Sequence, residues 1–189
     1  MILPVNMFVT HEWTVEDRNM IIAETKRLRL RLLERDDLDA LLKIWGDAET
    51  MMYCGGAGSR DQEAGSLDYY IRQQEEMGFS TYAVELKENG ELIGVCGFNP
   101  PGEGSDAEIM YHFNKSYWGK GYANDAVEKT LEYARESLDI SKVGALVHEE
   151  NKASAAILYN NGFQFCGMKW CDATKRMEEH YQLVLKGDQ

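Results

Sequence analysis

The chain has 189 residues, of which 44% are hydrophobic, and its formal net charge is −12. This length and this apolar content predict one globular domain with its own core. The acidic balance argues against nucleic acid or an anionic membrane as the main partner, because both require a basic surface.

The four cysteines include no Cys-x-x-Cys pair, so neither a zinc site nor a disulfide framework is indicated and no metal is expected. The sequence has no apolar stretch of membrane length and no basic-then-apolar leader. We therefore expect no membrane partner and a reducing, cytoplasmic location. Residues 1–23 precede the first clear element and are interpreted as an N-terminal extension. A single domain is expected over residues 24–189.

The first elements follow from periodicity and capping signals. Leucines alternate with arginines over residues 26–33, which predicts a half-buried strand. A helix capped at Asp36 or Asp37 comes next. A second helix begins at the capping-box pattern of residues 59–62 and continues to about Met77.

Three strands are predicted in the middle of the chain. The first two, at residues 79–86 and 91–98, are joined by Asn89-Gly90, a dipeptide typical of a tight hairpin. The third covers residues 105–113.

A glycine-containing stretch, residues 117–123, lies between that third strand and a long helix. Gly119 and Gly121 leave the backbone bare, so its N–H groups can approach a ligand closely. The N-terminus of a helix favours phosphate, because it carries unpaired N–H donors and partial positive charge. The spacing matches neither a Walker loop nor a Rossmann fingerprint, and a plain strand-to-helix turn is the alternative.

The second half of the chain predicts a strand–helix–strand crossover. Apolar residues recur with helical period over residues 123–138, and a strand follows at residues 142–148. Such a crossover makes a parallel pair, with a ligand crevice outside the carboxyl ends of the strands. The remaining elements are a short helix and an antiparallel hairpin, at residues 151–161, 163–170 and 178–185.

The residues from Glu108 to Ala123, together with those from Asn151 to Phe163, resemble the GNAT superfamily of acyl-CoA N-acyltransferases. The run from Glu24 to Arg31 resembles its ribosomal-protein N-terminal (RimJ/RimL-type) acetyltransferase branch. The likeness covers nearly all of the chain. It implies an α+β GNAT-like fold, in which a mixed, mostly antiparallel sheet of about seven strands contains one central parallel pair and carries helices on both faces.

The resemblance implies acetyl-CoA as co-substrate, with its diphosphate on the glycine loop. The family pattern Arg/Gln-x-x-Gly-x-Gly/Ala falls on Trp118, Gly121 and Ala123, so Trp118 departs from the consensus. In the family, a bulge opens the preceding strand to the pantetheine arm, and a backbone N–H near Tyr111 serves as oxyanion donor. The implied cofactor-binding residues are Tyr111, His112, Phe113, Trp118, Gly119, Lys120, Gly121, Tyr122, Ala123 and Asn151.

The acceptor amine is mostly protonated at pH 7, so a base is useful. Glu108 stands where many family members carry a glutamate on this strand, and several of them use it as the base. A strand carboxylate paired with a cation is the alternative interpretation. His112, on the same face of the strand, and Asp172 are further candidates.

The departing thiolate needs a proton donor. Ser154 matches a serine of the resembling branch, and a serine bonded to its own backbone is the alternative. Many relatives place a tyrosine at the position that Leu158 occupies here, and Tyr159 lies one residue later. One residue turns the side chain about 100° around a helix, so Tyr159 can point away from the sulfur.

In the family, the first two helices wall the acceptor site. The aromatic candidates there are Trp45, Tyr53, Tyr69 and Tyr70, with core packing as the alternative. The implied reaction is direct attack, in a ternary complex, of a primary amine of a peptide or small molecule on acetyl-CoA, by a monomer or homodimer. A non-catalytic acyl-CoA sensor or protein-interaction module on the same fold is the alternative hypothesis. A third hypothesis is an acyl group longer than acetyl.

Overall fold

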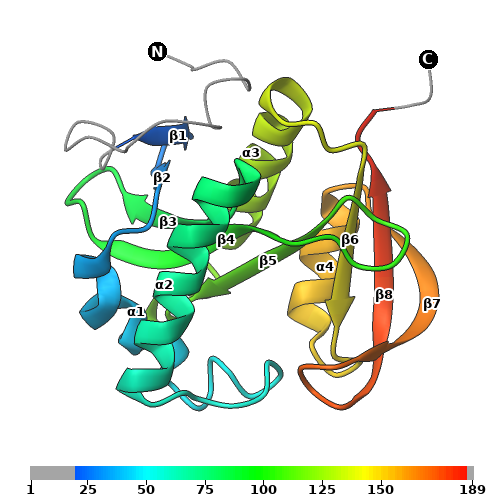
Figure 1. The fold of residues 1–189 in the computed structure, drawn as a ribbon, viewed down its shortest axis with the longest axis horizontal. Helices are drawn as coiled ribbons and strands as arrows, with labels where there is room; N and C mark the ends of the chain where they lie inside the picture. Colours follow the sequence, from blue (N-terminus) through cyan, green and yellow to red (C-terminus); the bar gives the residue numbers. More distant parts are fainter. Residues whose placement is uncertain (1–19, 187–189) are drawn as a thin grey trace.

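The computed structural model describes residues 20–186. Its sheet has the strand order β1-β2-β3-β4-β5-β6-β8-β7, in which only β5 and β6 are parallel neighbours (Figure 1). The strands are β1 (Ile21–Glu24), β2 (Leu28–Arg31), β3 (Thr81–Leu86), β4 (Leu92–Asn99), β5 (Ala107–Phe113), β6 (Lys142–Val147), β7 (Gln164–Cys171) and β8 (Arg176–Val184). The helices are η3 (Arg35–Asp37), α1 (Leu38–Trp45), α2 (Arg60–Met77), η4 (Lys115–Tyr117), α3 (Tyr122–Ser137) and α4 (Lys152–Asn160).

The fold class predicted from the sequence is confirmed, with one strand more than expected. The extra strand, β1, pairs antiparallel with β2. Three of its residues, Ile21 to Ala23, fall within the stretch interpreted as an N-terminal extension. Residues 1–19 of that stretch lie outside the described part of the chain.

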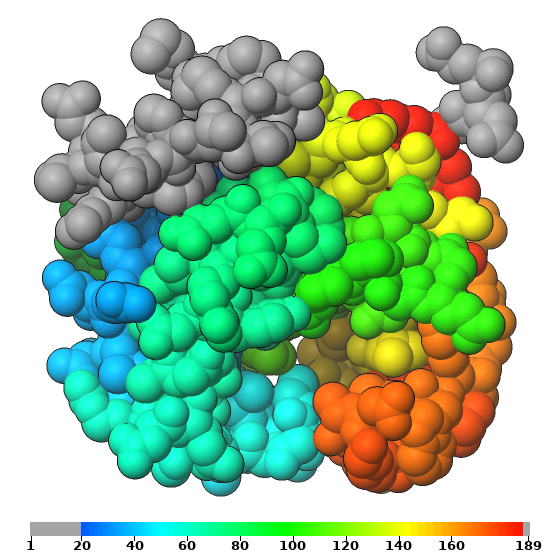
Figure 2. Space-filling view, viewed as in Figure 1, coloured from blue at the N-terminus to red at the C-terminus, as the bar shows by residue number. Residues whose placement is uncertain are grey.

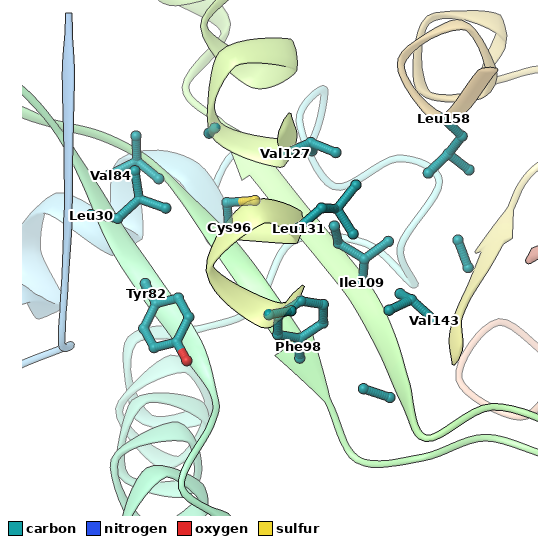
Figure 3. Packing of buried hydrophobic residues seen from close by; sticks show 14 of the residues in the cluster. Leu30, Tyr82, Val84, Cys96, Phe98, Ile109, Val127, Leu131, Val143 and Leu158 are labelled. Carbon is teal, nitrogen blue, oxygen red and sulfur yellow. The ribbon is translucent and has the colours of Figure 1, made fainter. Parts of the chain in front are cut away.

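Two hydrophobic clusters lie on opposite faces of the sheet. The larger packs α3 and α4 on one face, and Figure 3 shows Val127 and Leu131 of α3 beside Cys96 and Ile109 of the sheet. The smaller packs α1 and α2 against the other face. Period-two strands explain this division, because alternate side chains point to alternate faces.

A buried ion network joins β2 to η3 and to β3. The Arg31 guanidinium contacts Asp37 at 2.7 Å and Glu85 at 2.8 Å, and it donates a hydrogen bond to the Leu32 carbonyl. All three charged side chains are about nine-tenths buried. Asp37 also accepts from the Glu34 backbone N–H, so it closes the turn that starts η3.

We expect Arg31→Met to lower the free energy of unfolding by about 3–5 kcal/mol, because it removes the cation of the buried Asp37 and leaves the buried Glu85 with only Arg29, at 3.9 Å. Urea denaturation measures this difference. Arg29→Met is the matched control, since Arg29 lies on the same strand with 39% of its side chain exposed, and it should cost less than about 1 kcal/mol. Equal losses in the two variants would contradict the prediction.

Candidate active site

The parallel strands β5 and β6 pair only at their first residues and then separate. The paired positions are Ala107 with Val143 and Glu108 with Gly144, although β5 continues to Phe113. Figure 1 shows the two strands diverging like the arms of a V. Each remains paired to its other neighbour, β5 to β4 and β6 to β8, along the rest of its length.

The expected bulge in β5 is wrong. The ladder between β4 and β5 runs without a shift in register from the pair Gly94–Phe113 to the pair Asn99–Glu108. The gap opens because each strand follows its own outer neighbour, and neighbouring strands in a sheet are rotated by its twist. The gap therefore belongs to the whole sheet and not to an inserted residue.

The backbone of Tyr111 and Phe113 faces this gap. The Asn114 N–H donates to the Ile93 carbonyl of β4, so every second residue of β5 counted back from Asn114 bonds to β4. The residues between them direct their N–H and C=O groups away from β4, towards β6. Since β6 does not pair with β5 beyond Gly144, the Tyr111 N–H is available to a ligand in the gap.

The glycine loop ends at the start of α3 with its N–H groups free. Gly119 and Gly121 have φ angles of 72° and 79°, which lie in the left-handed region that favours glycine. No side chain caps α3. Among the described residues no hydrogen bond uses the backbone N–H of Gly119, Lys120 or Gly121. The first turn of α3 adds the unpaired N–H groups of Tyr122 and Ala123.

Trp118 and the two lysines near the loop have partners within the protein. The Trp118 indole donates to the Phe113 carbonyl at 2.7 Å, while 47% of the residue is exposed. Lys115 forms ion pairs with Asp47 and Glu49 of the segment after α1. The exposed Lys120 ammonium donates to the Ser116 carbonyl and lies 5.0 Å from the centre of the Tyr117 ring.

Ser154 and Tyr111 form a pair of hydroxyl groups across the open part of the sheet. The two oxygens lie 2.7 Å apart, and the Tyr111 hydroxyl also donates to the Ser154 carbonyl at 3.1 Å. Burial raises the pKa of Tyr111, and its hydrogen bond with Ser154 opposes that rise. Tyr111 is therefore neutral at pH 7. The Asn151 side chain accepts from the Ser154 N–H and thereby caps α4.

Tyr159 lies apart from this pair. It is 57% exposed, and its ring packs edge-on against Tyr181 of β8 with the centroids 5.4 Å apart. Leu158, one residue earlier, is fully buried in the core. The rotation of about 100° per helical residue explains why Leu158 faces the sheet and Tyr159 does not.

Glu108 is the last residue of β5 that pairs with β6, so it lies where the gap begins. Its carboxylate packs against the backbone of Gly102, and its stem lies over Gly144 of β6. Burial raises the pKa of Glu108 above the ordinary value, and the charge of Lys169 opposes this rise. A carboxyl group with a raised pKa accepts a proton more readily near neutral pH.

His112 is a weak base in its folded environment. It shares a face of β5 with Glu108, on the side of α1 and α2. Its Nδ1 atom is buried and has no hydrogen-bond partner among the described residues. Burial lowers the pKa of His112 to about 4, so the ring is neutral at pH 7.

On the face of α1 and α2, the open part of the sheet meets a hollow. Figure 2 shows it bounded by α2, by the segment after α1 and by the turn between β7 and β8, with atoms of the β5 and β6–α4 regions at its floor. Tyr53, in the segment after α1, packs against His148, which follows β6, with ring centroids 4.7 Å apart. Trp45 is buried in the core, and Tyr70 packs against it.

Tyr69, a candidate for the acceptor wall, and Asp172, a candidate base, lie at the surface. Tyr69 is 44% exposed and packs edge-on against its neighbour Tyr70. Asp172 forms an exposed ion pair with Lys175 in the turn after β7. The sequence analysis missed the contact of His148 with Tyr53. Its signal was the position of His148 just beyond the carboxyl end of a parallel strand.

Within residues 20–186, no group of histidine, cysteine and acidic side chains is arranged to hold a metal ion. The same residues contain no helix with the length and apolarity needed to cross a membrane.

Comparison with known proteins agrees with this geometry. The family model described as "Acetyltransferase (GNAT) domain" matches residues 27–164. The chain is 35% identical to the "Uncharacterized N-acetyltransferase p20" of Bacillus licheniformis, over 76% of this chain and 83% of that protein. It is 30% identical to "Uncharacterized N-acetyltransferase YoaA" of Bacillus subtilis, over 76% and 82%.

Among solved structures, a GNAT-family acetyltransferase from Bacillus anthracis has a TM-score of 0.76 at 23% identity, covering 88% of this chain and 99% of its own. The ribosomal L7/L12 α-N-protein acetyltransferase RimL, in complex with coenzyme A, has a TM-score of 0.69 at 18% identity, covering 87% and 98%. The chain therefore belongs to the GNAT acetyltransferase family, the acetyl-CoA-dependent class that its sequence resembles, and it is an enzyme of that class.

The low pKa of His112 predicts a pH-dependent loss of stability. Because the folded-state pKa of about 4 lies below the ordinary histidine pKa of 6.5, the unfolded chain binds more protons between these two pH values. The stabilising contribution is complete above pH 6.5 and is lost as the pH falls towards 4.

Between pH 7 and pH 5, the free energy of unfolding should therefore fall by about 2 kcal/mol more in the wild type than in His112→Leu. Urea denaturation at the two pH values measures it. The other histidines are present in both proteins and cancel in the comparison. Parallel pH dependences for the two proteins would contradict the prediction.

Proposed function

We propose that the enzyme transfers an acetyl group from acetyl-CoA to a primary amine, by direct attack of the amine within a ternary complex. The observation that carries this proposal is the gap between β5 and β6, which lies beside an uncapped helix N-terminus. An extended pantetheine arm is similar to a peptide strand, so it can bond to the unpaired edge of β5. The diphosphate suits the free N–H groups from Gly119 to Ala123.

In this mechanism the Tyr111 N–H stabilises the oxyanion that forms when the amine attacks the thioester carbon. Glu108 accepts a proton from the amine, directly or through water. Its raised pKa favours this role, and alternation along β5 directs its side chain to the face of α1 and α2, the face on which Figure 2 shows the hollow. The C–S bond then breaks, and the proton lost by the amine is balanced by one gained at the thiolate.

We assign the donor to the thiolate to Ser154 rather than to Tyr159. Tyr111 has one hydroxyl proton, which can go either to the Ser154 carbonyl or to Ser154 Oγ. When it goes to Ser154 Oγ, the serine proton is free to point at the sulfur. The contact of Tyr159 with Tyr181 draws its hydroxyl towards β8. His112 and Phe113 serve the cofactor through the backbone of β5, and Asn151 through the cap that orients the start of α4.

The acceptor is a primary amine of a peptide N-terminus or of a small molecule. RimL acts on a ribosomal protein, as its name states, which supports a peptide N-terminus as the first substrate to test. Release of free CoA from acetyl-CoA, measured against a panel of peptides and amines, tests the proposed activity. Saturable acetyl-CoA binding without turnover on any amine would favour a sensor.

Gly121→Val should weaken acetyl-CoA binding by about 100-fold, since a side chain strains the left-handed backbone and disturbs the N–H donors. Its Cβ atom would also lie 3.3 Å from the Arg27 guanidinium. Isothermal titration calorimetry measures the affinity. Gly167→Val is the control, because Gly167 has a φ of 105° and open space around it in β7, the strand at the far edge of the sheet. Unchanged affinity in Gly121→Val would mean that the loop is only structural.

Glu108→Gln should lower kcat/KM for the amine by about 100-fold, while the affinity for acetyl-CoA stays the same. In the wild type, the rate should fall as the pH drops through the raised pKa of Glu108, because the carboxylate is then protonated. The variant should lack that limb of the pH profile. Glu103→Gln, in the exposed loop before β5, is the control. A variant with the wild-type profile would exclude Glu108 as the base.

A further inference from the structure

A single arginine, 93 residues before Lys120 in the chain, holds the glycine loop and the first turn of α3. Arg27 lies in the turn between β1 and β2, and its guanidinium donates a hydrogen bond to the Lys120 carbonyl at 2.9 Å. It also donates to Asp125 twice, through Nε at 3.0 Å and Nη2 at 2.8 Å. Its flat face lies over the Tyr122 ring, 4.5 Å from the centroid.

These contacts fix the geometry of the loop. The Lys120 carbonyl and the Gly121 N–H belong to one planar peptide and point in opposite directions. Holding the carbonyl on Arg27 therefore turns the Gly121 N–H away from the arginine and leaves it available. The Tyr122 ring limits the movement of the guanidinium from the other side.

The contacts also neutralise a charge that opposes the proposed ligand. Asp125 lies in the first turn of α3, close to where a diphosphate would bind, and an unpaired carboxylate there would repel it. The ion pair with Arg27 cancels this repulsion, and the pair is protected from solvent to a degree, with 42% and 32% of the two side chains exposed. The chain has a net charge of −12, so such local neutralisation matters for holding an anion.

We propose that Arg27 is a positioning residue for the CoA diphosphate: it orients the Lys120–Gly121 peptide and neutralises Asp125, without itself binding a phosphate. This inference rests on the proposed diphosphate site at the loop. It assigns a specific role to Arg27, a residue of the Glu24–Arg31 run, which is far in sequence from the glycine loop.

Arg27→Gln should raise the dissociation constant for CoA about tenfold, while kcat at saturating acetyl-CoA changes less than about twofold. Isothermal titration calorimetry with CoA measures the affinity without turnover. Arg29→Gln is the matched control. Arg29 lies two residues further on, is similarly exposed and pairs with Glu24 instead of the loop, so its affinity should remain that of the wild type.

Asp125→Asn separates neutralisation from direct phosphate contact. Alone it should change CoA affinity less than about twofold, because its charge is already neutralised. In the Arg27→Gln background it should recover at least about half of the lost affinity on a logarithmic scale, since it removes the exposed repulsion. This recovery also shows that the double variant is folded.

The remaining outcomes overturn separate claims. If the wild type shows no saturable CoA binding, the proposed function itself fails. If the wild type binds CoA and Arg27→Gln binds equally well, only the role of Arg27 fails. If the two substitutions act additively, neutralisation of Asp125 does not contribute to CoA binding, and the proposed role of Arg27 is overturned in that part.

Discussion

The separation of β5 from β6 is the constraint on which the rest of the site depends. Each strand is committed to its outer neighbour, β5 to β4 and β6 to β8, so neither can close the gap without breaking an established ladder. The opening is therefore built into the sheet and exists before any ligand binds. It leaves backbone N–H groups of β5 unpaired at the one place where α3 also presents free N–H groups.

The strand that borders the gap also divides the proposed chemistry between two faces. Alternation along β5 directs Glu108 to the side of α1 and α2, and Tyr111 to the side of α3 and α4, where it meets Ser154. A thioester held in the gap would lie between a carboxylate on the acceptor side and a pair of hydroxyl groups on the cofactor side. The proposed base and the proposed acid thus lie on opposite faces of β5.

The charges near the loop also suit an anionic cofactor. An acidic protein can bind an anionic cofactor without a basic surface if oriented backbone dipoles supply the attraction and nearby carboxylates are neutralised. Lys115 shows that a nearby cation is not by itself a phosphate ligand, because Asp47 and Glu49 already hold it. In the proposed site, the donors are the bare amides of the loop.

Local signals in the sequence determined most of the architecture. The Asn89-Gly90 turn, the Ser59–Gln62 capping box and the crossover after the glycine loop lie where they were predicted. Each depends on residues close together in the chain. The candidate loop could also be found in this way, because the glycines adjoin a strongly periodic helix.

Only the tertiary structure decided how the site is assembled. The contact of Arg27 with Asp125 joins residues 98 positions apart, and no pattern within one element predicts it. The absence of a bulge in β5 depends on how two halves of a sheet twist, and the direction of Tyr159 depends on how α4 is rotated against β8. Sequence periodicity fixes which face of an element is buried, but the partners across that face are set by packing between distant segments.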